Sequence, residues 1–575
     1  MLMIKNLYFK NTQMRIFKLK LFLIVFFMFG FFVGNIKRAS AIVYLSAETS
    51  NDNQIQINEA LNNESARKDG ILSVYLKGGV YIISDSIKIG SNTILEGDAN
   101  AVIKLVNSAY WPKGRAMIES KETSLSNVTI HNFQIDGNKE GNGILTCGSE
   151  YYDMMEFENC SNLEVFGMYL YNSGKDILKV TNCSGVKFHD NIIKEQGGTA
   201  VHFAGSSDVS AYNNNITISC GNGFRIYDSS GANLYNNIIT SKTDSSWGIE
   251  MNSGNSGVIN IYSNRIYSLQ SSGIGSLGGG SARLNIHHNI IYDCKGGVLV
   301  EKSISDDSYE GVIIEFNTIV SNDGPAISTD DLEVLAQNNI LAGNQGISGS
   351  FISRGNCFSD NSGATENDVT VDDPGFVDAS IHDYHLKSQA GRWSGIGWVK
   401  DDSSSACIDR GAGVVSVEPY PNGCNPNPGR YGNTSEASLS GNVAPAAMPA
   451  NPDVYSYYYL HSHGDESEKE CYCASEDAAS GDNSEEKNLV VTDKCSANSL
   501  CLIVKNALSG IGFLLKIFFS ISLFLFLFSI MLHFLAPNKN NLIYKINLVI
   551  RYILLCFFVS FFLWLLFKGF ILLMG

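Results

Sequence analysis

A short pattern, Asn-x-Ile, recurs through the middle of this 575-residue chain and limits its fold more than any other feature. Complete copies begin at Asn191, Asn214, Asn237, Asn264, Asn289 and Asn317, and degenerate copies lie at 133–135, 168–170 and 339–341. The first three complete copies are 23 residues apart, and the later spacings range from 22 to 28 residues. A period in the twenties, made of short apolar-alternating stretches between Gly, Asn and Ser turns, indicates a solenoid.

Each repeat has room for three short strands and lacks the leucine skeleton and helical stretches of leucine-rich repeats. We therefore predict an all-β chain, a right-handed parallel β-helix whose Val, Ile and Leu side chains point inward. The repeated asparagines are expected to stack as a ladder in which the amides of neighbouring coils bond to each other. Upstream, residues 52–61 are amphipathic, with Asp52 as a candidate N-cap, and predict a helix that caps the first coil.

The period also predicts a vertical column of charged side chains on one sheet, because residues one period apart lie above each other, about 4.8 Å per coil. Two apolar residues stand thirteen and eleven positions before the copies that begin at 168, 191, 214 and 237. The next coil carries an insertion, and Ile249 and Met251 fit the same slot. The residue between the two members of each pair must point outward. These outward residues are Glu156, Lys179, His202, Arg225 and Glu250. The neighbouring outward column holds Glu158, Thr181, Ala204, Tyr227 and Asn252. Stacked cations repel each other, which a merely soluble surface would avoid, so the first column is a candidate site.

The segments LKGGVYIIS (76–84) and SNTILEGDANAVIKL (91–105), with the helix and the Asn-x-Ile coils, resemble the pectate-lyase-type right-handed β-helix superfamily over roughly residues 50–440. Residues 373–386 and 406–411 resemble the closing segment of many secreted β-helix proteins. The stretch 130–252 is also similar to disaggregatase-type β-helix proteins of cell-clustering archaea, which act on a chondroitin-like uronate matrix. The resemblance implies that the protein acts on carbohydrate at the outer face of one sheet, although the superfamily also contains non-enzymatic surface proteins.

The chemistry of the column suits an anionic polymer. Arg225 offers a planar guanidinium for a uronate carboxylate, and neutralising that carboxylate acidifies the adjacent ring proton. His202, flanked by two cations, is expected to be a neutral base that removes this proton, with Lys179 as the rival base. Tyr227 is placed to donate a proton to the leaving oxygen or to the opposite ring face. These roles predict β-elimination or C5-epimerisation. Further substrate contacts are assigned to Glu156, Glu250, Asn252 and Asp228.

Two other functions stay open. A binding or adhesive surface protein would use the same long sheet without catalysis. A glycoside hydrolase needs two carboxylates about 5–9.5 Å apart, whereas Glu156 and Glu250 are four coils, or about 19 Å, apart. Asp228 with Glu250 is the pair that a hydrolase would use.

No cofactor or metal is predicted, because the column lacks the acidic cluster of calcium-dependent pectate lyases. Residues 136–141 begin like a calcium loop, but Cys147 stands at its twelfth position, so calcium is only a weak alternative. Residues 273–278 match a dinucleotide fingerprint without a following helix, and we assign them to a solenoid turn.

Both ends of the chain are apolar and predict export to the cell membrane. Residues 14–20 are basic, 21–33 are apolar and 39–41 are small, which are the three parts of a secretory signal. Residues 517–536 and 546–567 are long enough to span a bilayer, and the basic loop between them predicts that the body lies outside the cell. We expect a monomeric ectodomain that is anchored by this hairpin and faces an extracellular acidic polysaccharide.

The formal net charge of −16 argues against nucleic acid as a partner, since phosphate binding needs a concentrated basic face. The predicted parts are a signal segment (1–41), the cap and first coils (42–130), further coils (131–360), a closing segment (361–440), a flexible acidic stalk (441–508) and two membrane helices (509–575).

Overall fold

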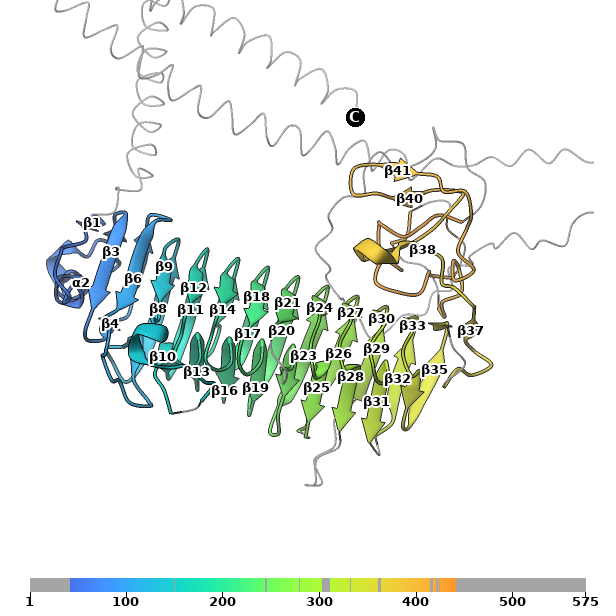
Figure 1. The fold of residues 1–575 in the computed structure, drawn as a ribbon, viewed down its shortest axis with the longest axis horizontal. Coiled ribbons are helices and arrows are strands. Elements are labelled where there is room, and N and C mark those ends of the chain that lie inside the picture. The colour runs from blue at the N-terminus through green and yellow to red at the C-terminus, as the bar shows by residue number, and fades with distance from the viewer. Residues whose placement is uncertain are drawn as a thin grey trace, which may run out of the picture. The chain divides into compact units, whose positions relative to one another are not determined.

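The computed structural model describes residues 42–440 except 149, 243–245, 279, 302–310, 331, 360–362, 414–416, 420–421 and 423–424. Within these residues the chain winds through three parallel sheets, and one strand of each coil joins each sheet (Figure 1). The predicted signal segment, stalk and membrane helices lie outside the described residues. Among the described residues, no helix combines the length and the apolar character that crossing a bilayer requires.

We number the sheets by their order within a coil. In the described residues, sheet 1 contains β4 (Ile87–Ile89), β7 (Ala116–Ser120), β10 (Asp153–Glu158), β13 (Leu178–Thr181), β16 (Val201–Ala204), β19 (Phe224–Tyr227), β22 (Ile249–Met251), β25 (Ser272–Leu277), β28 (Gly296–Glu301), β31 (Ile327–Asp330) and β34 (Ile347–Ser348).

Sheet 2 contains β1 (Ile42–Leu45), β2 (Leu72–Leu76), β5 (Thr93–Gly97), β8 (Leu125–His131), β11 (Cys160–Phe166), β14 (Lys187–His189), β17 (Ser207–Tyr212), β20 (Ser230–Tyr235), β23 (Ser256–Tyr262), β26 (Arg283–His287), β29 (Gly311–Glu315), β32 (Val334–Gln337) and β35 (Phe351–Arg354).

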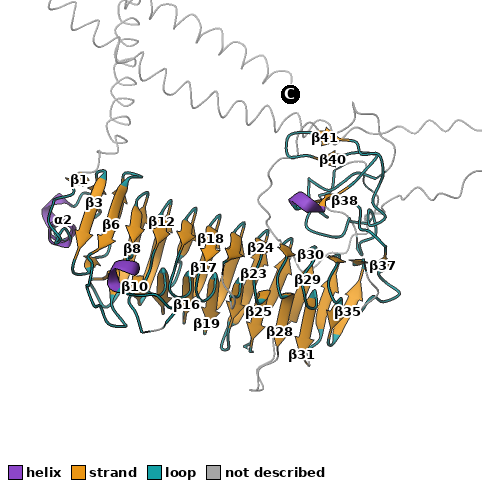
Figure 2. Cartoon of the chain, in the orientation of Figure 1, coloured by secondary structure: helices purple, strands orange, loops and turns teal. Residues whose placement is uncertain are grey.

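Sheet 3 contains β3 (Gly79–Ile83), β6 (Ala101–Leu105), β9 (Gln134–Asp136), β12 (Tyr169–Tyr171), β15 (Ile192–Lys194), β18 (Asn215–Ile218), β21 (Ile238–Ser241), β24 (Arg265–Tyr267), β27 (Ile290–Tyr292), β30 (Thr318–Val320), β33 (Ile340–Ala342), β36 (Cys357–Phe358) and β37 (Val369–Thr370). The parallel pairing of sheet 3 therefore continues beyond residue 360. Strands dominate the coils, as Figure 2 shows.

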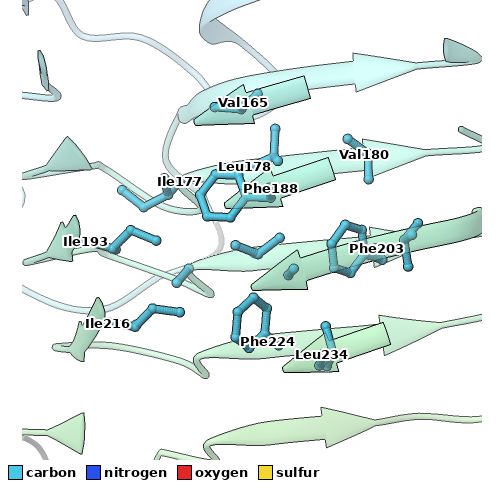
Figure 3. Close-up of a cluster of buried hydrophobic side chains, with 14 of the residues drawn as sticks. Val165, Ile177, Leu178, Val180, Phe188, Ile193, Phe203, Ile216, Phe224 and Leu234 are labelled. Atoms are coloured by element: carbon cyan, nitrogen blue, oxygen red, sulfur yellow. The ribbon is translucent and has the colours of Figure 1, made fainter. Parts of the chain in front are cut away.

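The core is a continuous column of apolar side chains inside the three sheets. Alternate residues of each strand point inward, so β13 buries Leu178 and Val180 while Lys179 between them points outward. Figure 3 shows how the inward residues of successive coils, such as Val180 and Phe203, lie next to one another. The all-β parallel solenoid predicted from the period is therefore confirmed.

The predicted asparagine ladder is confirmed at the turn between sheets 2 and 3. Each side-chain Nδ2 donates to the Oδ1 of the next asparagine at 2.9–3.0 Å. The ladder consists of Asn191, Asn214, Asn237, Asn264, Asn289, Asn317, Asn339 and Asn356. Asp368 ends it, because its carboxylate accepts hydrogen bonds from both the backbone N–H and the Nδ2 of Asn356. Every rung is buried, so these amides are satisfied by one another and by backbone carbonyls.

Sheet 2 carries a second ladder, made of aromatic rings that point outward. Neighbouring ring centroids are 4.5–5.0 Å apart, and the ring planes lie within 7° of parallel. The rings belong to His131, Phe166, His189, Tyr212, Tyr235, Tyr262 and His287. The rings cover each other's faces because the strand spacing matches a stacking distance, so the ladder ties successive coils together.

One α-helix, α2 (Gln54–Leu61), lies against β1 to β4, and its buried face includes Ile57 and Leu61. Its N-cap is Asn53 rather than Asp52, because Asp52 accepts hydrogen bonds from the side chains of Ser84 and Gln54. The helix lies where the sequence predicts it, and its role as a cap stays a prediction. The described residues also form short 3₁₀ turns at η1 (Glu64–Ala66), η2 (Glu140–Asn142) and η3 (Ala379–Ile381).

The C-terminal described residues fold back over the outer face of sheet 3. They include two small antiparallel pairs, β38 (Phe376–Asp378) with β39 (Asp383–Leu386) and β40 (Arg392–Trp393) with β41 (Trp398–Val399). Strand β15 has an exposed outer residue, Ile192, whereas all residues of β27, β30 and β33 are buried. The covering contacts include Tyr292, whose ring stacks on His382 at 4.1 Å.

The described residues contain three disulfides. Cys160–Cys183 joins neighbouring coils, and Cys147–Cys220 and Cys357–Cys407 join segments that are 73 and 50 residues apart in the chain. Cys147–Cys220 attaches the loop before β10 to the turn that leads into β19. Cys357–Cys407 attaches the closing segment to β36. The acidic stalk cysteines lie outside the described residues.

Replacing one rung of the asparagine ladder should destabilise the protein. Asn214→Ala removes the acceptor used by the backbone N–H and the Nδ2 of Asn191, and the donor to Phe188 O and Asn237 Oδ1. We expect the free energy of unfolding to fall by about 3 kcal/mol, since buried partners are left unsatisfied. Urea denaturation followed by circular dichroism measures this. Asn215→Ala, one residue along and exposed, is the control and should change the midpoint little; equal effects of the two substitutions would contradict a structural ladder.

Candidate functional site

The charged column predicted from the sequence exists on sheet 1. Strand pairing places Glu156, Lys179, His202, Arg225 and Glu250 opposite one another on five consecutive strands, all pointing outward. The same register extends the column to Lys88 and Glu119 on β4 and β7. On the other side it continues into Gly275, Leu299, Ser328 and Ser348. Gly275 lies in strand β25, so the assignment of residues 273–278 to a turn is wrong. The charges are therefore confined to one part of the sheet.

The expectation that unpaired cations repel each other in this column is wrong. Lys179 Nζ lies 2.5 Å from Glu156 Oε1, and Arg225 Nε lies 2.5 Å from Glu250 Oε2. Lys88 and Glu119 form a third pair at 2.8 Å. Residues of opposite charge on adjacent strands are close enough to bond, so the column neutralises itself pair by pair.

This pairing removes Lys179 from the candidate bases. Burial alone would lower the pKa of its amine, but the hydrogen bond to Glu156 and the nearby carboxylates of Glu156, Asp153 and Asp176 outweigh burial and raise that pKa. A general base must give up its proton near the working pH. Lys179 is instead a protonated cation held on Glu156.

Arg225 keeps most of its hydrogen-bonding capacity for a ligand. Its Nε–H donates to Glu250, and this is its one hydrogen bond to the described residues. A guanidinium has five N–H donors, so the two terminal nitrogens stay open. The side chain is 37% exposed, whereas Glu250 is 7% exposed and also accepts a bond from Asn222 Nδ2. Glu250 thus orients the guanidinium with its outer edge toward solvent.

His202 does not sit between two free cations as expected, because both neighbouring cations carry their own carboxylates. Its Nδ1 lies 3.6 Å from Asp176 Oδ2. Burial would raise the pKa of Asp176, but the contact with His202, the charge of Lys175 and a bond from Thr199 N–H together lower it. Asp176 is therefore an ionised carboxylate that faces one ring nitrogen. Nε2 has no hydrogen-bond partner among the described residues.

Asp176 belongs to a polar row that the sequence analysis missed. Asp153 begins β10, and Asp176, Thr199 and Asn222 stand in the turns just before β13, β16 and β19, the strands of the next three coils. Asp153 Oδ1 accepts a bond from Asp176 N–H at 3.0 Å, and Asp176 Oδ1 accepts one from Thr199 N–H at 2.7 Å. Asn222 reaches Glu250. The signal was present in the sequence, because these four residues repeat with the same 23-residue period as the asparagine ladder.

The remaining predicted residues lie around Arg225 without contacting it through any described bond. Tyr227 points outward two residues beyond Arg225 on β19 and is 42% exposed. Asp228 follows that strand directly, with φ +47°, and its Oδ1 approaches Gly254 so closely that a Cβ there would lie 1.6 Å away. Asn252 has a buried Oδ1 with no hydrogen-bond partner in the described structure.

Trp247 is a second residue that the sequence analysis missed. Its backbone N–H donates to Asn222 Oδ1 at 3.1 Å, and its carbonyl accepts a bond from Gly223 N–H at 3.0 Å. Its indole lies on the outward side of Gly275, where a Cβ would be 1.9 Å from Cζ3. The charged column therefore ends, one strand after Glu250, at a half-buried indole ring.

Among the described residues, no group of three or more His, Cys, Asp or Glu side chains is arranged to hold a metal ion. In the weak calcium-loop candidate, Asp136 is buried and forms an ion pair with Lys104 at 2.7 Å. Cys147 is in a disulfide with Cys220.

Two family profiles match this chain. The one described as "Right handed beta helix region" matches residues 116–281, which hold most of the column. The one described as "Disaggregatase related" matches residues 336–411, a different stretch from the 130–252 on which that resemblance was expected.

Among curated proteins, the preneck appendage protein of Bacillus phage PZA is 31% identical over 96 residues, which are 16% of this chain and 11% of the phage protein. The pre-neck appendage protein of Bacillus phage phi29 is 30% identical over 96 residues. This chain therefore spans only 11% of the length of these relatives.

Similar solved structures include three bacterial proteins. The A-module of the Azotobacter vinelandii mannuronan C-5 epimerase AlgE4 is 17% identical with a TM-score of 0.33, over 57% of this chain and 97% of that chain. The Yersinia enterocolitica family 28 exopolygalacturonase is 14% identical with a TM-score of 0.37, over 57% and 78%. The Streptococcus pneumoniae surface protein and adhesin PfbA is 10% identical with a TM-score of 0.36, over 57% and 100%.

Asp153 should make the stability of the folded protein depend on pH. Burial and the neighbouring Asp176 raise the pKa of Asp153 to about 6, although Lys175 opposes them. The folded state then holds this proton more tightly than the unfolded state, so stability is lost as pH rises from about 4 through about 6. Asp153→Asn cannot ionise and should be spared this loss, which amounts to at most about 3 kcal/mol.

Melting temperatures of both proteins at pH 4, 5, 6 and 7 measure the difference. Asp228→Asn, an exposed carboxyl at the end of β19, is the control and should follow the wild type. If the melting temperatures of the wild type and of Asp153→Asn change in parallel with pH, the prediction is contradicted.

Proposed function

Since the described residues form a parallel β-helix that a right-handed β-helix profile matches over residues 116–281, we propose that sheet 1 acts on an acidic, uronate-containing polysaccharide by β-elimination or C5-epimerisation. The observation that carries this proposal is the pair of neighbours His202 and Arg225. His202 presents Nε2 without a hydrogen-bond partner among the described residues while Asp176 faces its Nδ1, and Arg225 on the next strand presents the open edge of its guanidinium.

Arg225 binds the substrate carboxylate. Its Nε–H is taken by Glu250, so the two terminal nitrogens form the available edge, which matches the two oxygens of a carboxylate. Binding this carboxylate draws electron density from the adjacent ring carbon, C5, and makes its proton more acidic. Glu250 and Asn222 act as positioning residues, because they hold the guanidinium in one orientation.

His202 removes the C5 proton. Asp176 faces Nδ1 and favours the tautomer that carries its proton there, which leaves the lone pair of Nε2 free to act as the base. In the elimination, the electron pair of the broken C–H bond forms the C4–C5 double bond as the C4–O bond breaks. The electrons of the C4–O bond leave with the oxygen, which takes a proton from Tyr227.

The same groups support epimerisation. If the C4–O bond stays intact, the carbanion is stabilised by Arg225 at the carboxylate, and Tyr227 returns a proton to C5 from the opposite face. Both outcomes use His202 as the base and Tyr227 as the acid, and only epimerisation requires the two to act on opposite faces of the sugar ring.

A non-catalytic binding protein is the second candidate, and a specific observation favours it. Each Lys and Arg of the column is already paired with a carboxylate of the neighbouring strand. Such a self-neutralised face suits graded recognition of a polymer over many coils. The hydrolase alternative has less support, because the Glu250 carboxylate is bonded to Arg225 and Asn222 and is not free to act as an acid.

We also propose that this β-helix is displayed on the outer face of a cell membrane. The apolar segments 21–33, 517–536 and 546–567 support this. So do the three disulfides of the coils, since disulfides persist in oxidising compartments.

Arg225→Ala should lower kcat/KM on polyuronates by about a hundredfold or more, because the charge that stabilises the carbanion is lost. The purified full-length chain is incubated with polygalacturonate, alginate and chondroitin. Ultraviolet absorbance then detects unsaturated uronate ends, and proton NMR detects epimerised sugars. Lys88→Ala, at the far end of the column, is the control and should retain activity. Saturable binding with no product from any polymer would favour the non-catalytic alternative.

His202→Ala should lower kcat by about 10²- to 10⁴-fold, because the base is lost. Asp176→Asn keeps an acceptor for Thr199 N–H but removes the negative charge, and it should lower kcat by about 10- to 100-fold with little change in KM. Initial rates over a range of substrate concentrations separate the two constants. If activity survives in His202→Ala but disappears in Lys179→Ala, the roles assigned to these two residues are reversed.

A further inference from the structure

We infer that Trp247 forms a stacking subsite for a pyranose ring at one end of the charged column, and that this contact sets the direction in which the polymer lies on sheet 1. The inference rests on the proposed function for the identity of the polymer. It goes further by assigning a binding role to an indole and to the glycine beneath it, neither of which belongs to the catalytic groups.

The position of Trp247 is fixed by the row that also supports the catalytic residues. Asn222 accepts the backbone N–H of Trp247 and donates its own Nδ2 to Glu250, which in turn holds Arg225. Gly223 N–H bonds to the carbonyl of Trp247. The indole therefore sits at a defined distance from the carboxylate-binding edge of Arg225.

Gly275 explains why the indole can lie there. It occupies an outward position in the middle of β25, opposite Glu250, and its φ is not in the left-handed region. Glycine weakens a strand, so a glycine at such a position marks a place where something approaches the backbone closely. At Gly275 the group that approaches the backbone is the six-membered ring of Trp247, whose Cζ3 and Cε3 lie 1.9 and 2.2 Å from where a Cβ would be. Any side chain at 275 would displace the ring.

The chemistry of the indole suits one side of a sugar ring. A half-buried tryptophan presents a large rigid apolar surface at low entropic cost, and the C–H groups of a pyranose form a matching apolar patch. Two strand spacings, about 10 Å, separate Arg225 from Gly275. A pyranose unit is about as long as one strand spacing, so the sugar on Trp247 lies two units from the sugar whose carboxylate Arg225 binds.

This arrangement makes the site directional. On the other side of His202, the column presents Lys179, Glu156, Glu119 and Lys88, which are paired charges. From Lys88 to Glu250 the column itself holds no Phe, Tyr or Trp, and the Trp247 indole lies beyond Glu250, on Gly275. A polymer whose carboxylate is held by Arg225 thus meets this indole when its chain extends from Arg225 toward Gly275, and this selects one end of the chain for the Trp247 side.

The experiment compares two ways of losing the indole contact in the full-length chain. Trp247→Ala removes the ring, and Gly275→Ala keeps the ring but pushes it off the sheet. Trp247→Phe retains an aromatic surface, and Tyr44→Ala removes an exposed aromatic side chain from sheet 2 as the control. Affinity for polygalacturonate and alginate is measured by affinity electrophoresis, and product lengths are measured by mass spectrometry. Circular dichroism and melting temperatures establish that each variant is folded.

We expect Trp247→Ala and Gly275→Ala each to weaken binding about tenfold and to change the product-length profile in the same way. Trp247→Phe should stay within about threefold of the wild type, and Tyr44→Ala should match it. Gly275→Ala keeps the test decisive if Trp247→Ala does not fold.

Wild-type affinity and product lengths in both indole variants, with binding still lost in Arg225→Ala, would overturn the subsite and leave the proposed function standing. If the wild type binds neither acidic polymer, the proposed function falls, and the same variants are compared on the neutral polymer hydroxyethylcellulose. Binding that depends on Trp247 then supports the subsite, and binding independent of Trp247, or no binding, overturns it.

Discussion

The asparagine ladder is the interaction on which the rest of the structure depends. Each rung bonds to the amide of the next coil and to backbone carbonyls, so the coils can pair in only one vertical register from Asn191 to Asn356. A slip of one residue would turn every inward side chain outward and leave buried amides unsatisfied. The register in turn decides which side chains stand above each other on all three sheets.

The register brings residues that are distant along the chain together on one sheet, where they form the candidate site. His202 and Arg225 are 23 residues apart in the chain but adjacent on sheet 1. The same stacking places Asp176 one coil before His202 and Glu250 one coil after Arg225, so each of these two proposed catalytic groups obtains its supporting carboxylate from a neighbouring coil. The proposed groups sit on strands, and Asp176 sits on a turn that leads into a strand.

The three sheets use their outer faces differently. The closing segment covers sheet 3 from about β24 onward, and Tyr292 is buried beneath His382. On sheet 2, the outward rings from His131 to His287 stack on each other, so their faces are covered by neighbouring rings and hold successive coils together. Sheet 1 differs from both, because its outward groups include the half-exposed guanidinium of Arg225 and the exposed ring of Tyr227. The half-buried indole of Trp247, from the turn before β22, also lies on its outer face.

The sequence by itself determined the solenoid, the asparagine ladder and the vertical order from Glu156 to Glu250, because period and strict alternation decide which strand residues stack and which point outward. Only the tertiary structure decided the pairing within the column, since the bond between Lys179 and Glu156 depends on side-chain conformations that the period does not specify. It also decided that Asp176 faces His202 and that Trp247 lies on Gly275. Both Asp176 and Trp247 stand in turns, where alternation does not hold and the direction of a side chain follows from the local backbone and from the coil beside it.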